Sequence, residues 1–498
     1  MGEAPQKTQP GLAKWAGSIY CGGWRKTPES TEVIEPATGN TLGRIGVASP
    51  KAVRQSAAAA AAAQREWEIT PFDQRARTLR KVATLIEERL PSLVDWIVRE
   101  TGSTQLKAQF ELGASIRAVH EAAAMPSQPT GLVLPSDRSR LSFCRRRALG
   151  VVSVISPFNF PFFLTIRAVS PALAVGNATL IKPNPATSIS GGFLIAELFE
   201  DAGLPRDLLH VLPGDAQTGE LMCSDPNVNM VQFTGSTTVG RKVGEIAGRH
   251  LKKVSLEMGG KNSLIVLEDA DIELAASNAA WASYMHQGQI CFAAGRTLVH
   301  RKIVADFTAA LVAKTKAIKV GDPSRESVAL GPMITSRQLR RVDEIVQQTV
   351  AQGASLEVGG THQGQFYQPT VLSQVKPGMR AYEDEIFGPV ASITAFDSDA
   401  EAIGMANSTE YGLVAAVISP SIGRAVAIGD KLRVGIVHIN DQTVGEEGVN
   451  PICGWGASGN GTGIGGPANW DEFSQWQWIT VKEIAPQYPI GIAPAAAS

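Results

Sequence analysis

Residues 151–182 read VVSVISPFNFPFFLTIRAVSPALAVGNATLIK, which is a short apolar run, a longer helix-like segment and a second short apolar run. The two short runs, Val151–Ser156 and Ala178–Lys182, contain β-branched residues and are bounded by Gly, Pro or Asn, as buried strands commonly are. Two similar runs follow at Leu208–Leu212 and Met230–Thr234. Because strands that alternate with helices favour a parallel, doubly wound sheet, this part of the chain predicts an α/β domain.

The second half of the chain shows the same alternation. Helices are expected over Val304–Lys319 and Gln338–Gln352. The apolar runs that we expect as strands are Ser263–Leu267, Arg296–His300, Ala391–Ala395, Ala415–Ser419 and Gly435–Asn440. The predicted fold class is therefore α/β, with two doubly wound parallel-sheet domains.

The residues before the first sheet are predicted to be mainly helical. The first twenty are interpreted as a loose arm, and Glu32–Val47 as a hairpin around a Thr-Gly-Asn turn. Ser49 and Pro50 have the residue types of an N-cap and a first helical position, so a helix should begin there. Further helices are expected over Phe72–Arg99, with a break near Pro91, and over Leu106–Ala124.

The composition is that of an ordinary globular chain. With 498 residues, of which 44% are hydrophobic and 19% charged, two or three domains are expected. A net charge of −1 gives no reason to expect a nucleic-acid partner or a membrane surface. No apolar signal segment and no stretch long enough to span a bilayer is found, so a cytoplasmic location is expected.

The cysteines and histidines do not suggest a metal or a disulfide. The five cysteines, at positions 21, 144, 223, 291 and 453, are scattered and form no CxxC pair. This pattern argues against a disulfide framework or a zinc site and favours a reducing compartment. The seven histidines show no metal-ligand spacing, so no metal is expected.

One cysteine lies in a distinctive stretch, SYMHQGQICFAAGR (283–296). Gly288 allows a backbone or ligand to approach closely, and the small residues after Cys291 leave room beyond the sulfur. A nucleophilic thiolate needs partial exposure and some positive potential nearby. Taken alone, however, a cysteine in an apolar neighbourhood is more often a buried small hydrophobe.

Two polar residues stand where strands are expected to end. Glu257, in SLEMGG, would be partly desolvated; burial raises the pKa of a carboxyl group, which suits a general base. The alternative is an ion pair with Lys261. Asn159, in SPFNFP, could stabilise an oxyanion together with the backbone N–H of Cys291, or could be a simple turn former.

Several motifs, in their order, resemble the aldehyde dehydrogenase superfamily along nearly the whole chain. They are SPFNFPFF (156–163), LIKPNPA (180–186), FTGSTTVG (233–240), SLEMGGKN (255–262), HQGQIC (286–291) and EDEIFGPV (383–390). HQGQIC together with GIVHIND (435–441) is most similar to the aromatic-aldehyde branch, which includes benzaldehyde and vanillin dehydrogenases. The resemblance implies NAD(P)-dependent oxidation of an aromatic aldehyde to the carboxylic acid. Succinate semialdehyde or another aliphatic aldehyde is the alternative substrate.

The resemblance also implies the roles of individual residues. Cys291 would be the nucleophile, Asn159 would hold the oxyanion, and Glu257 would activate the water that hydrolyses the acyl-enzyme. Because branches that transfer the acyl group to coenzyme A typically lack this Glu, its presence favours a free acid product. The residues implied to bind the cofactor are Ser156, Pro157, Phe158, Lys182, Asn184, Gly214, Phe233, Thr234, Gly235, Ser236, Glu257, Met258, Gly259, Glu385 and Phe387.

The cofactor is expected to be NAD or NADP. Relatives that prefer NAD commonly have a Glu at the position of Pro185, where it would bond a ribose 2′-hydroxyl, so dual use is plausible here. A formal GxGxxG occurs at Gly454, Gly456 and Gly459, but it does not open a βαβ unit. We interpret that loop as part of the substrate mouth and not as a dinucleotide site.

The substrate pocket is expected to involve one arginine and several aromatic residues. Arg167 is expected either to face the substrate, where it could bond a ring hydroxyl, a methoxy group or a carboxylate, or to lie on a helix surface. His286 is expected to be a structural or pocket residue, and Cys453 a packing residue. Candidate apolar walls, each of which is otherwise a core residue, are Phe158, Phe163, Tyr284, Phe292 and Trp455.

The resemblance implies a division of the chain. Residues 1–127 and 149–257 would form the dinucleotide-binding domain, 258–455 the catalytic domain, and 128–148 and 470–498 oligomerisation or bridging segments. Within these segments we expect a linker at Pro126–Asp137, an exposed strand at Ser139–Arg147 and an aromatic strand-like run at Trp470–Glu483. The expected partners are a small aldehyde and further copies of the chain, as a homodimer or homotetramer.

Two readings from other classes stay open. One is a cysteine hydrolase without redox chemistry, and the other is a catalytically retired binding protein on the same fold. The presence together of Asn159, Glu257 and Cys291 argues for a working enzyme.

Overall fold

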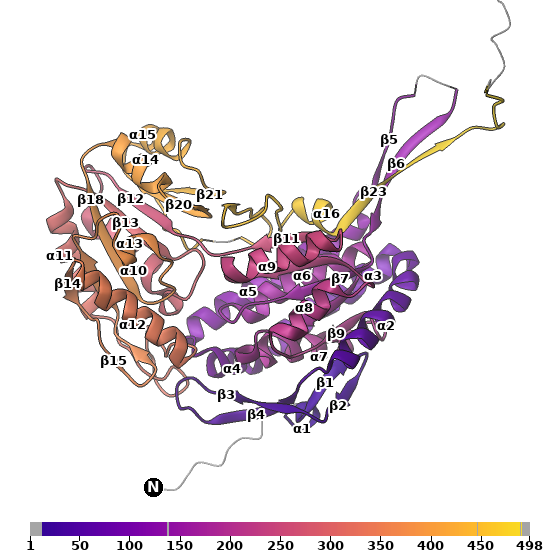
Figure 1. Ribbon diagram of the computed structural model, residues 1–498, viewed down its shortest axis with the longest axis horizontal. Coiled ribbons are helices and arrows are strands. Elements are labelled where there is room, and N and C mark those ends of the chain that lie inside the picture. The colour runs from indigo at the N-terminus through magenta and orange to yellow at the C-terminus, as the bar shows by residue number, and fades with distance from the viewer. Residues whose placement is uncertain (1–11, 137–138, 446, 489, 491–498) are drawn as a thin grey trace, which may run out of the picture.

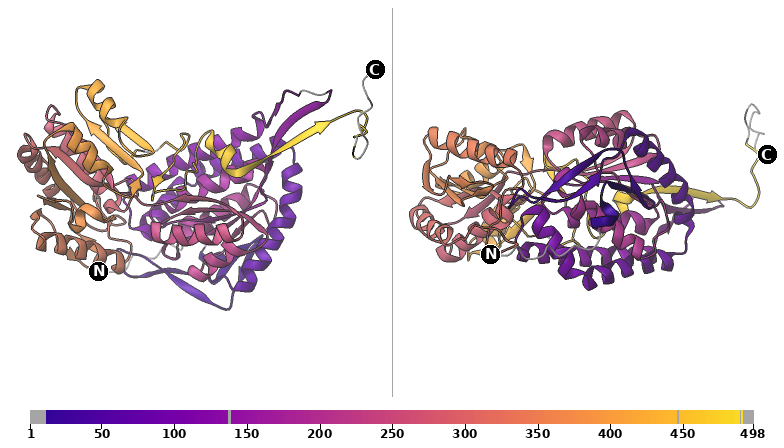
Figure 2. Two further views of the ribbon diagram at one scale, coloured as in Figure 1. Left: turned by 45° about the horizontal axis from the view of Figure 1, so that its top comes forward. Right: turned by 90° about the horizontal axis from the view of Figure 1, so that it is seen from below.

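The computed structural model describes residues 12–136, 139–445, 447–488 and 490. Two α/β bodies lie side by side, and a long arm projects from the first of them (Figure 1). Two other views show the same arm extending away from both bodies (Figure 2). No helix in the described ranges is long and apolar enough to cross a membrane.

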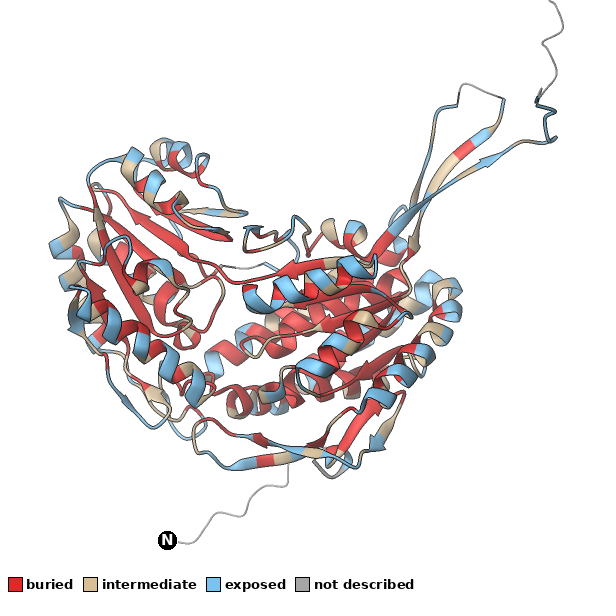
Figure 3. Cartoon of the chain, in the orientation of Figure 1, coloured by how far each residue is buried: buried red, intermediate tan, exposed pale blue. Residues whose placement is uncertain are grey.

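The first body is built on a seven-stranded sheet of order β11-β10-β7-β8-β9-β1-β2. Five of its strands are parallel, as predicted: β7 (Val151–Ile155), β8 (Ala178–Lys182), β9 (Leu209–Val211), β10 (Val228–Thr234) and β11 (Lys253–Glu257). The edge strands β1 (Ser18–Cys21) and β2 (Trp24–Lys26) are antiparallel. Buried residues follow the sheet and the helices against it (Figure 3).

The helices of this body confirm the predicted amphipathic segments. Ser49 caps the first long helix by accepting the N–H of Ala52 at 3.2 Å, and the predicted break near Pro91 falls at Arg89. The helices are α2 (Pro50–Ile69), α3 (Phe72–Glu88), α4 (Leu90–Thr101), α5 (Gln105–Ala124), α6 (Pro161–Val175), α7 (Leu194–Asp201), α8 (Ala216–Ser224) and α9 (Thr237–Arg249). The predicted hairpin forms from β3 (Ser30–Ile34) and β4 (Thr41–Gly46).

The interpretation of the first twenty residues as a loose arm is wrong where the structure describes them. Residues 12–15 form the short helix α1 (Leu12–Trp15), and β1 follows directly. Trp15 is 1% exposed and packs 5.3 Å from the ring of Trp96, so a buried aromatic anchors this segment. Residues 1–11 lie outside the described ranges.

The second body has a seven-stranded sheet of order β14-β17-β18-β13-β12-β20-β21. The strands are β12 (Asn262–Val266), β13 (Ala294–His300), β14 (Ser355–Val358), β17 (Thr370–Ser373), β18 (Val390–Phe396), β20 (Val414–Ile418) and β21 (Ile436–Ile439); only the edge strand β14 pairs antiparallel. Its helices are α10 (Ile272–Tyr284), α11 (Val304–Lys316), α12 (Ser336–Ala351), α13 (Arg380–Glu383), α14 (Asp399–Asn407) and α15 (Ile422–Gly429). The five predicted strands and two predicted helices are all present.

The arm joins segments from opposite ends of the chain. Strand β6 (Leu141–Ala148) pairs with β23 (Ser474–Val481) over its whole length and with the short β5 (Gly131–Val133) on its other side. Two predictions are wrong here: the expected linker contains β5, and the expected strand from Trp470 begins as the helix α16 (Ala468–Phe473). The parts of the bridging segments at 137–138, 489 and 491–498 lie outside the described residues.

Candidate active site

Cys291 follows a tight turn with an unusual backbone. His286 and Gln287 have φ of 48° and 57°, and Gly288 has φ of 64°, so three consecutive residues are left-handed. Only glycine fits the third position, because a Cβ there would lie 2.1 Å from the carbonyl oxygen of Gly388. Left-handed backbone at non-glycine residues persists only when its surroundings hold it, and it concentrates at functional sites.

A glutamine and an asparagine hold this turn and the chain beyond it. The side-chain amide of Gln287 donates to the carbonyls of Gly102 (3.0 Å) and Pro332 (2.8 Å). The amide of Asn262 donates to the carbonyls of Cys291 (2.7 Å) and Ala293 (2.8 Å). Cys291 itself is half-buried. Asn262 ends the motif SLEMGGKN and was not predicted to have a role. A polar residue at the start of a buried strand is the signal that could have pointed to it.

Asn159 and Glu257 lie at the carboxyl edge of the first sheet. Asn159 follows β7 and is 3% exposed, and its side-chain oxygen has no hydrogen-bond partner among the described residues. This oxygen can only accept a hydrogen bond, so a donor from a ligand or a water is expected beside it. Glu257 ends β11 and is 4% exposed. Since β7, β10 and β11 are adjacent and parallel, their ends place both side chains at one edge.

The loop with the formal GxGxxG packs against this edge. Gly459 forms a β-bridge with Glu257, and the backbone N–H of Met258 donates to the carbonyl of Ser458 at 2.9 Å. The loop does not connect a strand to a crossover helix, so it is not a dinucleotide fingerprint. It encloses the backbone on either side of Glu257.

A cradle for an anionic group is present at the start of α9. Its N-cap, Ser236, makes no side-chain capping bond, so first-turn N–H groups remain for a ligand. A Cβ on Gly235 would lie 2.6 Å from the ring of Phe233, and one on Gly214 would lie 2.1 Å from the hydroxyl of Thr218. Nearby, Lys182 ends β8 at 8% exposure; burial lowers the pKa of its ammonium, and the charge of Asp215 opposes this. This combination fits a dinucleotide phosphate and ribose.

Two further residues that the resemblance implies for the cofactor, Glu385 and Phe387, come from the second body and contact the first. The rings of Phe387 and Phe158 meet edge to face with centroids 5.7 Å apart, and Phe387 has a φ of 56°. The carboxylate of Glu385 accepts the N–H of Gly260 at 3.1 Å. It also leaves no room for a side chain at Gly259, because a Cβ there would lie 2.4 Å from Oε2 of Glu385. Enclosure by protein raises the pKa of Glu385 to about 7.

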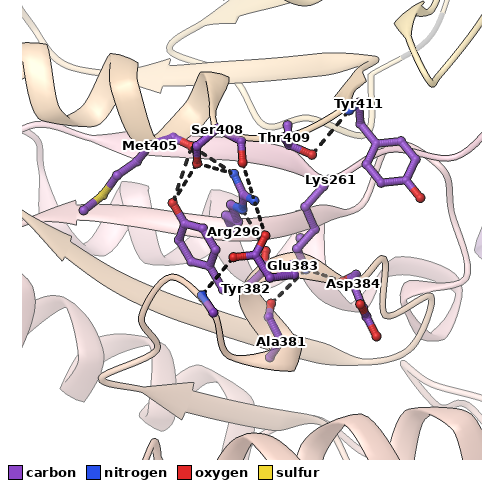
Figure 4. Close-up of polar contacts among 12 residues, drawn as sticks. Lys261, Arg296, Ala381, Tyr382, Glu383, Asp384, Met405, Ser408, Thr409 and Tyr411 are labelled. Atoms are coloured by element: carbon purple, nitrogen blue, oxygen red, sulfur yellow. Dashed lines mark hydrogen bonds and ion pairs between the residues drawn. The ribbon is translucent and has the colours of Figure 1, made fainter.

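Two buried cations, Lys261 and Arg296, hold the backbone of residues 381–384, which precede Glu385 (Figure 4). Lys261 donates to the carbonyls of Ala381 (2.8 Å) and Asp384 (2.6 Å), and burial, with the charge of Arg296, lowers its pKa to about 7. Arg296 donates to the carbonyl of Tyr382 at 2.9 Å and lies 3.9 Å from the centre of that ring. Lys261 was expected, if anything, to pair with Glu257, but its ammonium group instead donates to the chain segment before Glu385.

The expected pocket residues fall into two groups. Arg167 is 8% exposed, lies 5.5 Å from the ring centre of Phe163, and lines a small cavity together with Gly448, Asn450 and other residues. In contrast, Tyr284 donates its hydroxyl proton to the carbonyl of Thr370 at 3.1 Å inside the second body. Phe292 is also buried in that core, at 5% exposure. Trp455 is half-exposed and lies in β22 (Trp455–Gly456), which pairs with β19 (Tyr411–Gly412).

Comparison with known proteins decides the family. The sequence profile of the aldehyde dehydrogenase family matches residues 24–479. The chain belongs to this family. It is 47% identical over 478 residues to a vanillin dehydrogenase of Amycolatopsis, covering 96% of this chain and 98% of that protein. It is 46% identical to a benzaldehyde dehydrogenase (NAD(+)) of Pseudomonas putida, covering 95% of this chain and 98% of that one.

Solved structures agree with this assignment. A salicylaldehyde dehydrogenase of Pseudomonas putida in complex with salicylaldehyde superimposes with a TM-score of 0.92 at 32% identity, over 95% of this chain and 99% of that one. A betaine aldehyde dehydrogenase of Staphylococcus aureus in complex with NAD+ superimposes with a TM-score of 0.93 at 27% identity, over 97% of this chain and 98% of that one. The chain is therefore an aldehyde dehydrogenase that works with a nicotinamide cofactor, as the motifs predicted.

Proposed function

We propose that this aldehyde dehydrogenase oxidises an aromatic aldehyde of the benzaldehyde or vanillin type to the free carboxylic acid. The observation that carries the proposal is the identity of 46% and 47% with relatives named for these two substrates, over nearly the full length of each chain. A third relative, at 34% identity, is named for salicylaldehyde. An aldehyde on an aromatic ring is common to all three names.

In this mechanism Cys291 is the nucleophile. Its thiolate attacks the aldehyde carbon, and the oxygen that becomes negative is held by the side-chain amide of Asn159 and the backbone N–H of Cys291. The half-buried sulfur and the buried amide of Asn159 support this pairing. A nicotinamide cofactor, when bound, would supply the oxidant that takes a hydride from the aldehyde carbon.

Glu257 then serves as the general base. It takes a proton from the water that attacks the Cys291 thioester, which releases the acid and frees the sulfur. Its position at a strand end, 4% exposed, supports a carboxylate that is shielded from bulk solvent. A free acid is the expected product, because Glu257 directs water and not another acceptor to the thioester.

The cofactor is held between two regions. Lys182, Gly214 and the start of α9 would bind the adenosine and phosphate portion, and Glu385 with Phe387 the nicotinamide ribose. Residues 1–127 with 149–257 would thus form the dinucleotide-binding domain, and 258–455 the catalytic domain. Pro185 begins a 3₁₀ turn, and no carboxylate stands at that position to repel a 2′-phosphate, which supports use of both NAD and NADP.

The arm supports a dimer or a dimer of dimers. Trp476 and Trp478 of β23 are 50% and 62% exposed, and exposed aromatic side chains on a projecting sheet are favourable for burial between subunits. The cysteines in the described ranges form no disulfide with one another, which supports a reducing compartment such as the cytoplasm.

Formation of reduced cofactor, followed by absorbance, tests the proposal. The substrates are benzaldehyde, vanillin, 4-hydroxybenzaldehyde, succinate semialdehyde and propanal, each with NAD and with NADP. We expect turnover of the three ring aldehydes to exceed that of the two aliphatic ones. A clear preference for succinate semialdehyde would replace the aromatic assignment and make Arg167 a carboxylate clamp. Inactivity with all five would favour the hydrolase or the retired fold.

A further inference from the structure

A buried ion pair on α5 lies beside the oxyanion side of the site. Lys107 Nζ and Glu111 Oε2 are 2.5 Å apart, and their side chains are 1% and 0% exposed. Burying two charges costs free energy that their attraction does not always return, so such a pair is weak evidence for stability alone. Neither residue has a role in the mechanism above.

Glu111 holds the beginning of α6. Its second oxygen accepts the backbone N–H groups of Phe162 (2.9 Å) and Phe163 (3.1 Å). These N–H groups lie in the first helical turn, where no intrahelical partner exists, and the N-cap Phe160 supplies no side-chain cap. Glu111 therefore caps α6 from a neighbouring helix. Asn159 immediately precedes the N-cap residue, so its position depends on this contact.

Lys107 reaches the same segment by a different contact. Its ammonium lies 4.2 Å from the ring centre of Phe160. The Phe160 ring in turn meets the imidazole of His286 edge to face, with centroids 5.8 Å apart at 75°. His286 is the first of the left-handed residues that lead to Cys291. The contacts of Lys107 thus extend to both chain segments that carry the reacting groups.

The positive charge of Lys107 also affects the protonation of His286. Burial, and then the positive charge of Lys107, hold the pKa of His286 well below its usual value, so the imidazole stays neutral. The imidazole ring of His286 lies beside the backbone of Asn159, but neither ring nitrogen forms a regular hydrogen bond with the described residues. A neutral ring can pack against Phe160 and Asn159 without a further buried charge.

We propose that Lys107, acting with Glu111, is a positioning residue for the reaction: the pair sets the distance between the amide of Asn159 and the sulfur of Cys291. Lys107 is buried, and it acts through its contacts with Phe160 and Glu111. The inference rests on the proposed role of Asn159. Because a displacement of about 1 Å at a reacting group can cost on the order of 100-fold in rate, loss of this pair should slow acylation of Cys291.

The test uses two variants of the full-length enzyme, Lys107→Met and the double variant Lys107→Met/Glu111→Gln. The double variant removes the charge that the single one leaves buried, while the amide that replaces the carboxylate still offers an oxygen to α6. Acylation is followed with p-nitrophenyl acetate, which forms a tetrahedral oxyanion on Cys291 without any redox step. Rates are expressed per folded enzyme, with the folded fraction taken from the unfolding transition of each sample, so unfolded protein is not counted. The Kd of NAD and the thermal midpoint are measured on the same samples.

We expect the single variant to acylate about 10-fold to 100-fold more slowly, with the Kd of NAD changed less than about 2-fold. The double variant should regain much of the thermal midpoint but remain slow. Arg424→Met is the matched control, because Arg424 binds Asp399 and Glu268 far from these contacts and should affect only the midpoint.

Two outcomes would overturn the inference. One is a double variant that acylates at the wild-type rate, and the other is a loss of NAD affinity as large as the loss of acylation rate. Asn159→Ala separates this inference from the proposed function. If Asn159→Ala acylates normally, the oxyanion assignment fails; if it is slow while the Lys107 variants are normal, only the positioning role fails.

Discussion

The ring of Phe158 meets the ring of Phe387 edge to face, with 5.7 Å between their centroids and 82° between their planes. The two residues are far apart in the chain and come from different bodies of the molecule. Phe158 follows the strand β7 of the first sheet, and Phe387 precedes β18 of the second. This contact brings the segment that carries Asn159 to the segment that carries Glu385.

Loosening this contact should impair the cofactor side of the reaction. In Phe387→Leu the side chain stays apolar but the ring contact is lost at a residue whose backbone is already left-handed. We expect the pre-steady-state formation of reduced cofactor to slow about 10-fold, since Phe387 is proposed to hold the nicotinamide ribose in position for hydride transfer. Acylation by p-nitrophenyl acetate should be unchanged, and an equal fall in both rates would contradict the assignment.

Replacement of Lys261 should weaken cofactor binding. Lys261→Met leaves the carbonyls of Ala381 and Asp384 without their donor, and each buried carbonyl left unsatisfied costs about 1–3 kcal/mol. The loop before Glu385 should then move, and calorimetry should give a Kd for NAD raised about 10-fold. Arg424→Met, a cation on the outer side of the same body, should leave that Kd unaltered.

Arg167 should govern which ring substituents are accepted. A hydrogen bond to a charged group is worth about 1.5–3 kcal/mol, so Arg167→Leu should lower kcat/KM for vanillin about 10-fold to 100-fold. For benzaldehyde, which has no polar substituent, kcat/KM should fall by less than about 5-fold by the same reasoning. Equal losses with the two substrates would mean that Arg167 serves packing against Phe163 and nothing more.

The buried carboxyl group of Glu100 should make stability depend on pH. Its oxygens accept the N–H groups of Ile189 (2.9 Å) and Ser190 (2.6 Å), and burial raises its pKa to about 7 from an ordinary value of 4.5. Between these values the folded protein binds more protons than the unfolded chain, so this group's contribution to stability falls as pH rises from 4.5 to 7.

Glu100→Gln removes that titration. In the wild type, this group should lower the free energy of unfolding by at most about 1.4 kcal/mol for each unit that the pH rises. The variant should lack this decrease. Urea unfolding at several pH values, compared between the two proteins, measures the difference. Identical slopes in this window would show that Glu100 does not carry the raised pKa.

The sequence predicts the parts of the fold that depend on local pattern. The strands of both parallel sheets are short apolar runs, and Ser49 caps its helix as its residue type indicates. The strand β5 was missed because three residues, largely exposed, become a strand only by pairing with β6. The helix α10 has an exposed face that carries apolar residues, among them Leu274 and Trp281, so its sequence shows no polar stripe, although Asp271 caps it through the N–H of Leu274.

Some residues of the proposed site can likewise be predicted from local sequence, and others cannot. Cys291, Glu257 and Asn159 stand in short motifs, so the sequence can point to them before any contact is known. Lys107 and Lys261 cannot be found in this way, because a lysine is ordinarily exposed and only the folded contacts reveal its burial. Supporting residues are therefore found from contacts, and the proposed reacting residues from motifs.

The central claim is that Cys291 carries the acyl group of an aromatic aldehyde. Glu257→Gln should form this thioester in the presence of benzaldehyde and NAD but hydrolyse it slowly, because the water has lost its base. Intact-protein mass spectrometry should then find one added benzoyl group, and peptide mapping should place it on Cys291, with none on Cys291→Ala. An unmodified protein, or a benzoyl group on another cysteine, would contradict the account.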